Sequence, residues 1–195
     1  MINFFSVAAI IVSYFLGNLS PAILIGRAMG VDIRKEGSGN AGTTNVLRIL
    51  GKKAAVATLA IDILKGVAGV LLGRYIGGQE LAMVCGMAAF AGHIWPLAFG
   101  FRGGKGIATA FGVAVTLQPM FGLIELAIAG LFFLLSKRVS VGSLTAAALL
   151  PLVAYWTLPE FLPWGVVMAV IVLYKHRNNV KRLIKGEEPK VSFKK

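Results

Sequence analysis

The segment FGFRGGKG combines glycines with cations just before an apolar run that begins at Ile107. Glycine lets backbone N–H groups approach an anion closely, and Gly103, Gly104 and Gly106 supply three such positions. The N-terminus of a helix carries a partial positive charge of roughly half a unit, and Lys105 adds a full one. These residue types in this order predict a loop that cradles a phosphate. The alternative is a flexible interhelical loop whose cations only signal topology.

This loop matches neither of the common nucleotide motifs. Gly106 follows Lys105 where a Walker A loop has Ser or Thr, and the upstream glycine spacing is also wrong. No strand, βαβ unit or ribose-binding acid accompanies the glycines, which excludes a dinucleotide fingerprint. We therefore expect a phosphate site made of donors, helix dipole and charge alone.

A second segment, GVDIRKEGSGNAGTTNVLRILGKK, has similar ingredients. Ser38 and Asn40 offer hydrogen-bonding side chains among glycines, and Arg48 offers a planar, permanently charged donor suited to phosphate. A loop with a Ser or Asn helix cap would explain the composition equally well. The recurrence of these ingredients in two segments favours an anion site.

A third segment, YKHRNNVKRLIKGEEPK, reads as a basic juxtamembrane helix, for which attraction to anionic lipid is the simplest explanation. His176 and Asn179 are the exceptions, because lysine alone would serve that purpose. They are three residues apart, so on a helix they share a face and could converge on one ligand. Ser143 follows a Lys137–Arg138 pair and could face the same site or cap a helix.

The chemistry available to these segments is limited. Neither His93 nor His176 is followed at the fourth or fifth position by an acid, which argues against the histidine–acid dyad of coenzyme A-dependent glycerolipid acyltransferases. No serine–histidine–acid triad is evident, and no group of carboxylates or histidines would hold two metals. We therefore expect neither a metal nor a cofactor. The sequence predicts an enzyme that positions anionic substrates and lets an activated bond react.

The elements that position these segments are membrane helices. The chain is 57% hydrophobic and 14% charged, against roughly 25% charged in ordinary soluble domains. No basic residue precedes Arg27 and no tidy cleavage site follows the first apolar run, so we take that run as a membrane helix rather than a signal peptide. Several of the apolar runs approach the ~20 residues that span a bilayer. They are Phe4–Ile25, Ala54–Ile76, Leu81–Phe99, Ile107–Leu135, Val141–Leu158 and Phe161–Tyr174.

The placement of charge predicts the topology. The net charge is +12, and 18 of the 20 basic residues fall in four clusters: Arg27–Lys53, Arg102 with Lys105, Lys137 with Arg138, and Lys175–Lys195. The positive-inside tendency puts all four in the cytoplasm, which requires the run from Ile107 to Leu135 to be crossed twice. Gln118 and Pro119 supply the break, as two short helices or as a re-entrant hairpin. We expect one all-α domain over 1–195, with about seven transmembrane helices, an outside N-terminus and a cytoplasmic C-terminus.

Charged residues inside the apolar runs are few. Asp62 and Lys65 are three apart, and we expect them to neutralise each other within the bundle. Glu125 is isolated, and protonation, pairing and contact with water all stay open for it. Cys85 is the one cysteine, so no intrachain disulfide is possible.

Taken together, three segments resemble the motifs of a known family. GSGNAGTTNVLR, GHIWPLAFGFRGGKG and KHRNNVKRLIKGEEP, in this order between apolar runs, resemble the three motifs of the bacterial acyl-phosphate:glycerol-3-phosphate acyltransferases. The resemblance covers nearly the whole chain. It implies transfer of a fatty acyl group from acyl phosphate to the sn-1 hydroxyl of glycerol 3-phosphate. The products would be lysophosphatidic acid and phosphate, in the first acylation of phospholipid synthesis.

The resemblance also implies roles for particular residues. Ser38, His176 and Asn179 would form the catalytic set that orients the hydroxyl, and the substrates would be bound by Arg48, Lys105, Gly103, Gly104 and Gly106. Residue type and position, rather than the resemblance, add Asn40 and Ser143 to the expected substrate-binding set. The expected partners are acyl phosphate, glycerol 3-phosphate and membrane lipids. We expect a monomer in the bacterial inner membrane with its site on the cytoplasmic side. Nucleic acid is not expected, because no aromatic-interleaved basic repeat is present.

The rival from another class is a transporter or channel for an organic phosphate. It would use the same basic mouth, but it should also have polar groups near mid-membrane and paired broken helices in repeated halves. Only Asp62, Lys65 and Glu125 offer such groups here. A lipid phosphatase would need a carboxylate or histidine cluster that these segments lack. The sequence therefore favours the acyltransferase.

Overall fold

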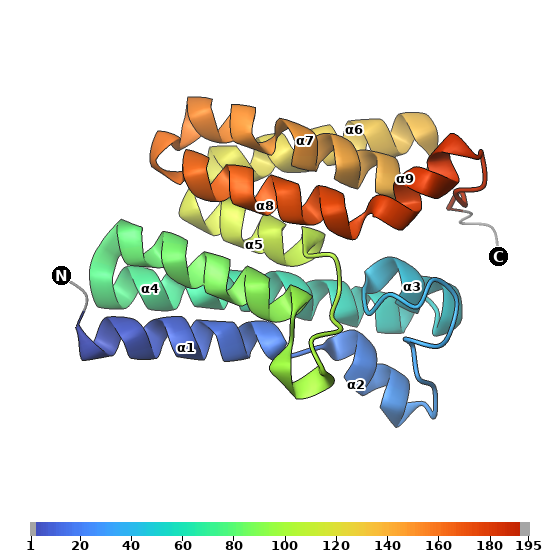
Figure 1. Cartoon of the computed structure of the whole chain (residues 1–195), viewed down its shortest axis with the longest axis horizontal. Coiled ribbons are helices and arrows are strands. Elements are labelled where there is room, and N and C mark those ends of the chain that lie inside the picture. Colours follow the sequence, from blue (N-terminus) through green and yellow to red (C-terminus); the bar gives the residue numbers. More distant parts are fainter. Residues whose placement is uncertain (1–2, 192–195) are drawn as a thin grey trace. The chain divides into compact units, whose positions relative to one another are not determined.

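The structure is a computed structural model that describes residues 3–191, and every regular element within that range is helical (Figure 1). This confirms the predicted all-α class. The chain forms two compact units, Met1–Leu117 and Gln118–Lys195, and each is described by itself. The prediction of one domain over 1–195 stays a prediction.

The first apolar run is bent, where the sequence predicted one continuous helix. Helix α1 covers Phe4–Asn18 and α2 covers Pro21–Ala28, with an angle of 41° between them. Proline has no N–H to donate, and it disfavours helical backbone in the residue before it, here Ser20. The run therefore breaks at the Leu19–Ser20 step, and a membrane-length segment becomes two shorter ones.

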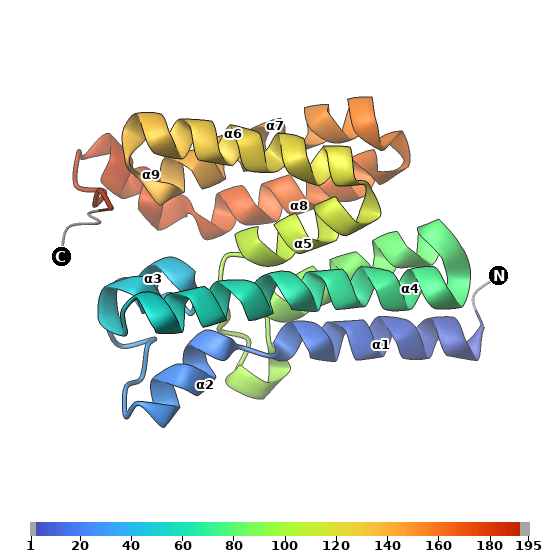
Figure 2. The ribbon, with the colours of Figure 1, turned by 180° about the vertical axis from the view of Figure 1, so that it is seen from behind.

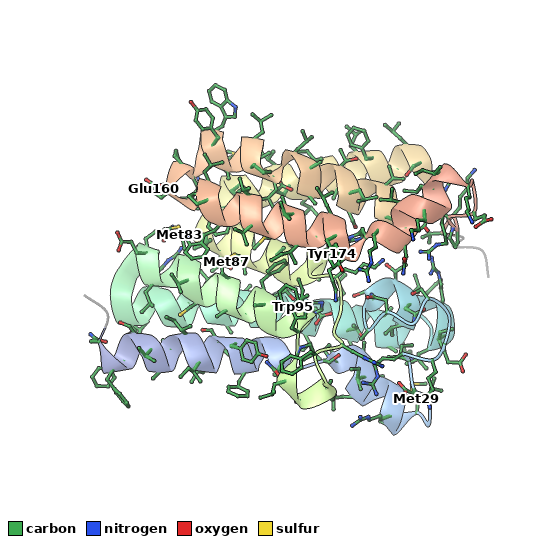
Figure 3. The ribbon with its side chains drawn as sticks, in the orientation of Figure 1. Met29, Met83, Met87, Trp95, Glu160 and Tyr174 are labelled. Atoms are coloured by element: carbon green, nitrogen blue, oxygen red, sulfur yellow. The ribbon has the colours of Figure 1, made fainter. Side chains whose placement is uncertain are left out.

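Helix α4 (Lys52–Ile94) is a hairpin of two antiparallel arms that lie side by side (Figure 1). Its backbone leaves helical geometry at Gly77 and at Gly78, where φ is +72°. This confirms the short turn that the sequence predicted between the second and third apolar runs. The returning arm carries Met83 and Met87 and ends at Trp95, before the predicted limit at Phe99 (Figure 3).

The other elements of the first unit pack on α4. They are α3 (Thr43–Ile49) and α5 (Ile107–Leu117), whereas the short 3₁₀ helix η1 (Leu97–Phe99) contacts α1. Figures 1 and 2 both show α2, α3 and the loop that follows α4 at the same end of this unit. An apolar cluster around Ile33 and Val46, against which Phe99 packs, holds that end together.

The second unit contains α6 (Pro119–Ser136), α7 (Val139–Thr157), η2 (Pro159–Phe161), α8 (Leu162–Lys175) and α9 (Arg177–Ile184). The predicted break at Gln118 and Pro119 is confirmed, since α5 ends at Leu117 and α6 begins at Pro119. Gln118 caps the new helix, because its Oε1 accepts a hydrogen bond from the Met120 amide at 2.7 Å. Glu125 is buried in α6.

Three helical segments of the described chain are long and apolar enough to cross a membrane: Lys52–Phe99, Pro119–Ser136 and Val139–Thr157. The bent pair α1 and α2 would make a fourth. Because the first of these segments folds back on itself at Gly77 and Gly78, it contains two apolar arms. The fold is that of an integral membrane protein.

Glycine-mediated packing gives a stability prediction. A Cβ at Gly112 of α5 would overlap the Ile63 carbonyl, whereas a Cβ at Gly130 of α6 meets nothing within 4 Å. Overpacking typically costs about 1–3 kcal/mol, so Gly112→Ala should lower the melting temperature of the detergent-purified protein by about 2–10 °C. Gly130→Ala, the matched control, should leave it unchanged or raise it, since alanine favours helix. Equal melting temperatures for the two variants would contradict this packing.

Candidate active site

The glycine loop, residues 100–106, leads from η1 into α5 and packs closely against the returning arm of α4. The Gly103 amide donates to the Ile94 carbonyl at 3.3 Å, and the Gly104 amide donates to the His93 carbonyl at 3.2 Å. The sequence predicted that these glycines would expose their amides to an anion. In the structure these two amides donate within the protein instead. The glycines are needed here because the two backbones touch.

Steric space explains each glycine of the loop. A Cβ at Gly103 would overlap the His93 carbonyl oxygen, and one at Gly104 would overlap Nε2 of the His93 ring. Gly106 has φ of +90°, and a Cβ there would overlap the Phe90 ring. The Lys105 side chain is half-buried between these glycines, immediately before α5 begins. The loop therefore presents a cation and a helix start on a backbone with little room to move.

The loop of the first motif is organised by Asn45, which the sequence offered as a hydrogen-bonding side chain but which was not among the predicted site residues. Asn45 of α3 is 1% exposed, and its Oδ1 accepts a hydrogen bond from the Ser38 amide at 2.9 Å. Its Nδ2 donates to the carbonyls of Ile33 and Glu36, each at 3.0 Å. The buried Asn45 side chain thus holds the loop by three hydrogen bonds, and Ser38 stays exposed at the surface. The signal for Asn45 in the sequence was its place in the first turn of a helix that follows a glycine-rich loop.

The first two motifs meet at one end of the first unit. The Arg34 guanidinium donates to the Phe99 carbonyl at 3.4 Å, and the Ala41 carbonyl oxygen lies 3.0 Å from the place where a Gly104 Cβ would stand. Arg48 is exposed on α3, and Asn40 is partly buried in the loop just before it. The structure therefore brings together the segments that carry Ser38, Asn40 and Arg48 with the glycine loop.

The remaining predicted residues lie in the second unit, and all three are buried. Ser143 is on α7, and His176 sits at the junction between α8 and α9 rather than within one helix. The Nδ1 atom of His176 lies 2.9 Å from the Val172 carbonyl oxygen. Asn179 donates from Nδ2 to Oε1 of Glu188 at 2.7 Å. The amide of this predicted catalytic residue is therefore held by a carboxylate of its own chain.

Glu188 is a second residue that the sequence reasoning missed. Besides Asn179, its carboxylate accepts from Nε of Arg182 at 2.7 Å, and its backbone carbonyl accepts from Nε of Arg138 at 2.9 Å. Burial alone would raise the pKa of Glu188, but hydrogen bonds from Asn179 and Arg182, with the Ser140 hydroxyl nearby, lower it overall. The charged carboxylate holds the residues after α9 against that helix, and the backbone carbonyl of Glu188 ties the third motif to Arg138 at the α6–α7 turn. Nothing local in KGEEP distinguishes this glutamate from its neighbour.

A buried ion cluster lies behind the glycine loop. Nζ of Lys65 is 2.7 Å from Oδ1 of Asp62, which confirms the predicted pair. His93 joins it, with Nδ1 at 3.2 Å from the same oxygen. Lys65 also donates to the Leu19 carbonyl at 2.8 Å, at the α1–α2 bend, and the Thr109 hydroxyl donates to the Asp62 carbonyl at 2.9 Å. Within residues 3–191, no three His, Cys, Asp or Glu side chains are grouped as a metal site would require.

Comparison with known proteins identifies the family. A family profile described as "Glycerol-3-phosphate acyltransferase" matches residues 7–186. The chain belongs to this family. A glycerol-3-phosphate acyltransferase of Thermoanaerobacter sp. (strain X514) is 42% identical over 193 residues, covering 97% of this chain and 98% of that protein. Another, of Hydrogenovibrio crunogenus, is 45% identical and covers 93% of this chain and 89% of its own length.

The fold of this family member also matches solved structures. A crystal structure of PlsY (YgiH), an integral membrane glycerol 3-phosphate acyltransferase, in its glycerol 3-phosphate form, is similar with a TM-score of 0.91. The two chains are 34% identical, and the match covers 96% of each. The lysophosphatidic acid form of PlsY gives a TM-score of 0.88 at the same identity. The resemblance stated from the three motifs is thereby confirmed at the level of the family.

The Glu188 contacts give a prediction about acid stability. Because the pKa of Glu188 is lowered from 4.5 on folding, the stabilisation it provides is present above about pH 4.5 and is lost as the pH falls through the lower, folded value. Glu188→Gln should melt at a lower temperature than the parent near pH 7. It should also lose less stability than the parent between about pH 7 and pH 4.

The control for this variant is Glu187→Gln, which removes the same charge from an exposed neighbour. Its melting temperatures should follow those of the parent at each pH. If Glu188→Gln and Glu187→Gln gave the same curve, the contacts of Glu188 would contribute no stability.

Proposed function

We propose that this glycerol-3-phosphate acyltransferase uses acyl phosphate as its donor and acylates the sn-1 hydroxyl of glycerol 3-phosphate. The products are lysophosphatidic acid and inorganic phosphate, and the reaction serves phospholipid synthesis. Family membership over residues 7–186 supports the acyl transfer itself. The solved structures of PlsY, in glycerol 3-phosphate and lysophosphatidic acid forms, are consistent with the same substrate and product here.

The observation that carries the proposal is the meeting, at one end of the first unit, of the two segments for which the sequence predicts anion binding. The glycine loop brings Lys105 to the start of α5, the neighbouring loop brings Ser38, and α3 brings the exposed Arg48. Charge-assisted hydrogen bonds from such groups are each worth roughly 1.5–3 kcal/mol. Both substrates carry phosphates, so a site of this composition suits both.

The residues divide into two roles in this proposal. Ser38, His176 and Asn179 orient the attacking hydroxyl. The substrates are bound by Arg48, Lys105, Asn40 and Ser143, within a loop shaped by Gly103, Gly104 and Gly106. Because the amides of Gly103 and Gly104 donate to α4 carbonyls, these two glycines contribute close packing of the loop rather than donors in the structure described.

The chemical step needs no strong base from the protein. The sn-1 hydroxyl oxygen attacks the acyl carbonyl carbon, the bond from that carbon to the phosphate oxygen breaks, and an ester forms. A phosphate oxygen of the donor accepts the hydroxyl proton, so phosphate leaves carrying it. The donor is a mixed anhydride with a good leaving group, and the protein acts by positioning and by stabilising negative charge.

For topology we propose seven crossings with the N-terminus outside, the C-terminus in the cytoplasm and the site on the cytoplasmic side of the bacterial inner membrane. The bent α1–α2 pair, the two arms of α4, and α5 to α8 make up the count. In support, the basic loops 29–51 and 95–106 share an end of the first unit. In the second unit the Val191 amide donates to the Lys137 carbonyl, which places its two basic segments together as well.

Helix α5 is short for a span, because its 11 residues extend about 16 Å against a hydrocarbon core of ~30 Å. A re-entrant arm that leads into α6 satisfies the same charge pattern. In either case we propose a single membrane domain that acts as a monomer, with surrounding lipid as its other partner.

The donor can be tested directly. Purified protein with labelled glycerol 3-phosphate should make lysophosphatidic acid from palmitoyl phosphate, and not from palmitoyl coenzyme A or palmitoyl acyl carrier protein. Equal use of the thioesters would overturn the proposed donor, and product from none of the three would overturn the enzyme. In sealed membranes supplied with palmitoyl phosphate, inverted vesicles should acylate external glycerol 3-phosphate and right-side-out vesicles should not. The reverse pattern would overturn the proposed orientation.

The route of the proton gives a separate prediction. A Ser38→Ala, His176→Ala double variant should be slowed by roughly a hundredfold through lost positioning, yet it should keep a near-normal pH profile. The reason is that the proton acceptor belongs to the substrate. Single-turnover rates at saturating substrate across pH would measure this. Complete loss of the chemical step would count against a substrate-assisted mechanism.

A further inference from the structure

A buried histidine lies directly behind the glycine loop of the first unit. We propose that His93, held by Asp62, is a positioning residue that fixes the Gly103–Lys105 segment in the conformation that receives a substrate phosphate. The inference rests on the proposed function, because it assigns the loop a phosphate to bind. Neither His93 nor Asp62 needs to touch substrate for this role.

The first observation is the contact between the imidazole and the loop. Nε2 of His93 stands where a Cβ of Gly104 would be, so the ring packs directly on the backbone at that glycine. The backbone of the same histidine accepts the Gly104 amide at 3.2 Å. Ring and carbonyl of one residue therefore hold the residue before Lys105 from two directions.

The second observation is the contact on the other edge of the ring. Nδ1 of His93 lies 3.2 Å from Oδ1 of Asp62, and the two side chains are 6% and 3% exposed. An ionised carboxylate only accepts hydrogen bonds, so this contact puts a proton on Nδ1 and fixes which edge of the ring faces the loop. A ring held at Nδ1 cannot rotate away from Gly104 without losing that contact.

The third observation is how firmly Asp62 itself is held. Lys65 binds its carboxylate at 2.7 Å, and the Thr109 hydroxyl binds its backbone carbonyl at 2.9 Å. Ionisable groups inside a membrane bundle are costly, and where they occur they usually serve function. A lysine alone would neutralise Asp62. The histidine adds a contact that leads from this buried pair to the glycine loop.

The first test replaces the imidazole of His93. His93→Asn keeps a donor that can reach Asp62 but removes the ring edge that faces Gly104. We expect the KM for glycerol 3-phosphate to rise about tenfold, with kcat and melting temperature changed much less. A role in stability alone would lower the melting temperature and leave the KM as it is, and that result would overturn the proposal.

A double-mutant cycle makes the test specific. Gly104→Ala should raise the same KM because its Cβ displaces the ring, and adding His93→Asn should restore part of the loss, since the space is then vacant. Gly103→Ala is the matched control. Its Cβ overlaps the main-chain carbonyl of residue 93, which His93→Asn leaves in place, so that pair should be additive. Additive effects in both pairs would overturn the proposal.

The outcome is separable from that of the proposed function. Thermal shift of the parent protein by glycerol 3-phosphate, and turnover with palmitoyl phosphate, test the function. If the parent binds and turns over its substrates while His93→Asn behaves as the parent does, only the role of His93 fails.

Discussion

The first unit is organised around one buried carboxylate. Asp62 is paired with Lys65 and faces His93, and these three residues connect the α1–α2 bend, both arms of α4, the start of α5 and the glycine loop. A charge buried in a low-dielectric interior must be paired and hydrogen-bonded, or it destabilises the fold by several kcal/mol. The arms of α4 and the bend at Leu19 therefore cannot shift independently of one another. The glycine loop, which packs on His93, is restrained by the same contacts.

Close backbone packing is the second consequence of this arrangement. Glycines in a loop next to a lysine invite interpretation as donors for an anion, yet Gly103 and Gly104 direct their amides to α4. Their lack of a side chain lets the loop lie against His93 and brings Lys105 to the start of α5. The asparagine that closes the neighbouring loop, Asn45, works in the same way, since it fixes backbone around Ser38 and leaves the serine exposed. In both loops the residues that shape the site differ from those proposed to bind substrate.

The features that could be predicted from the sequence are those set by neighbouring residues, and the contacts that were missed join residues far apart in the chain. The break at Gln118 came from proline chemistry and the charge rule, and the Asp62–Lys65 pair came from helical spacing, so both needed only neighbouring residues. The bend at Leu19 was also local, and Pro21 signalled it, but the length of the apolar run suggested an unbroken helix. His93 joins Asp62 only because α4 folds back at Gly77 and Gly78, and Glu188 reaches Asn179 only because the chain turns after α9. Contacts of that kind depend on tertiary structure, which spacing does not encode.

The contacts of the carboxylates decide whether these groups can act as general bases in the proposed reaction. Three carboxylates in or beside the motif segments are engaged by the protein's own donors: Asp32 by Arg34, Asp62 by Lys65, and Glu188 by Arg182. A carboxylate held in this way is a poor general base, because taking up a proton would cost it the interaction that holds it charged. The motifs keep their cations near the two loops proposed to bind phosphate and commit these three acids to structure. A site of that composition favours a reaction in which the substrate supplies both the activated bond and the proton acceptor, and acyl phosphate supplies both.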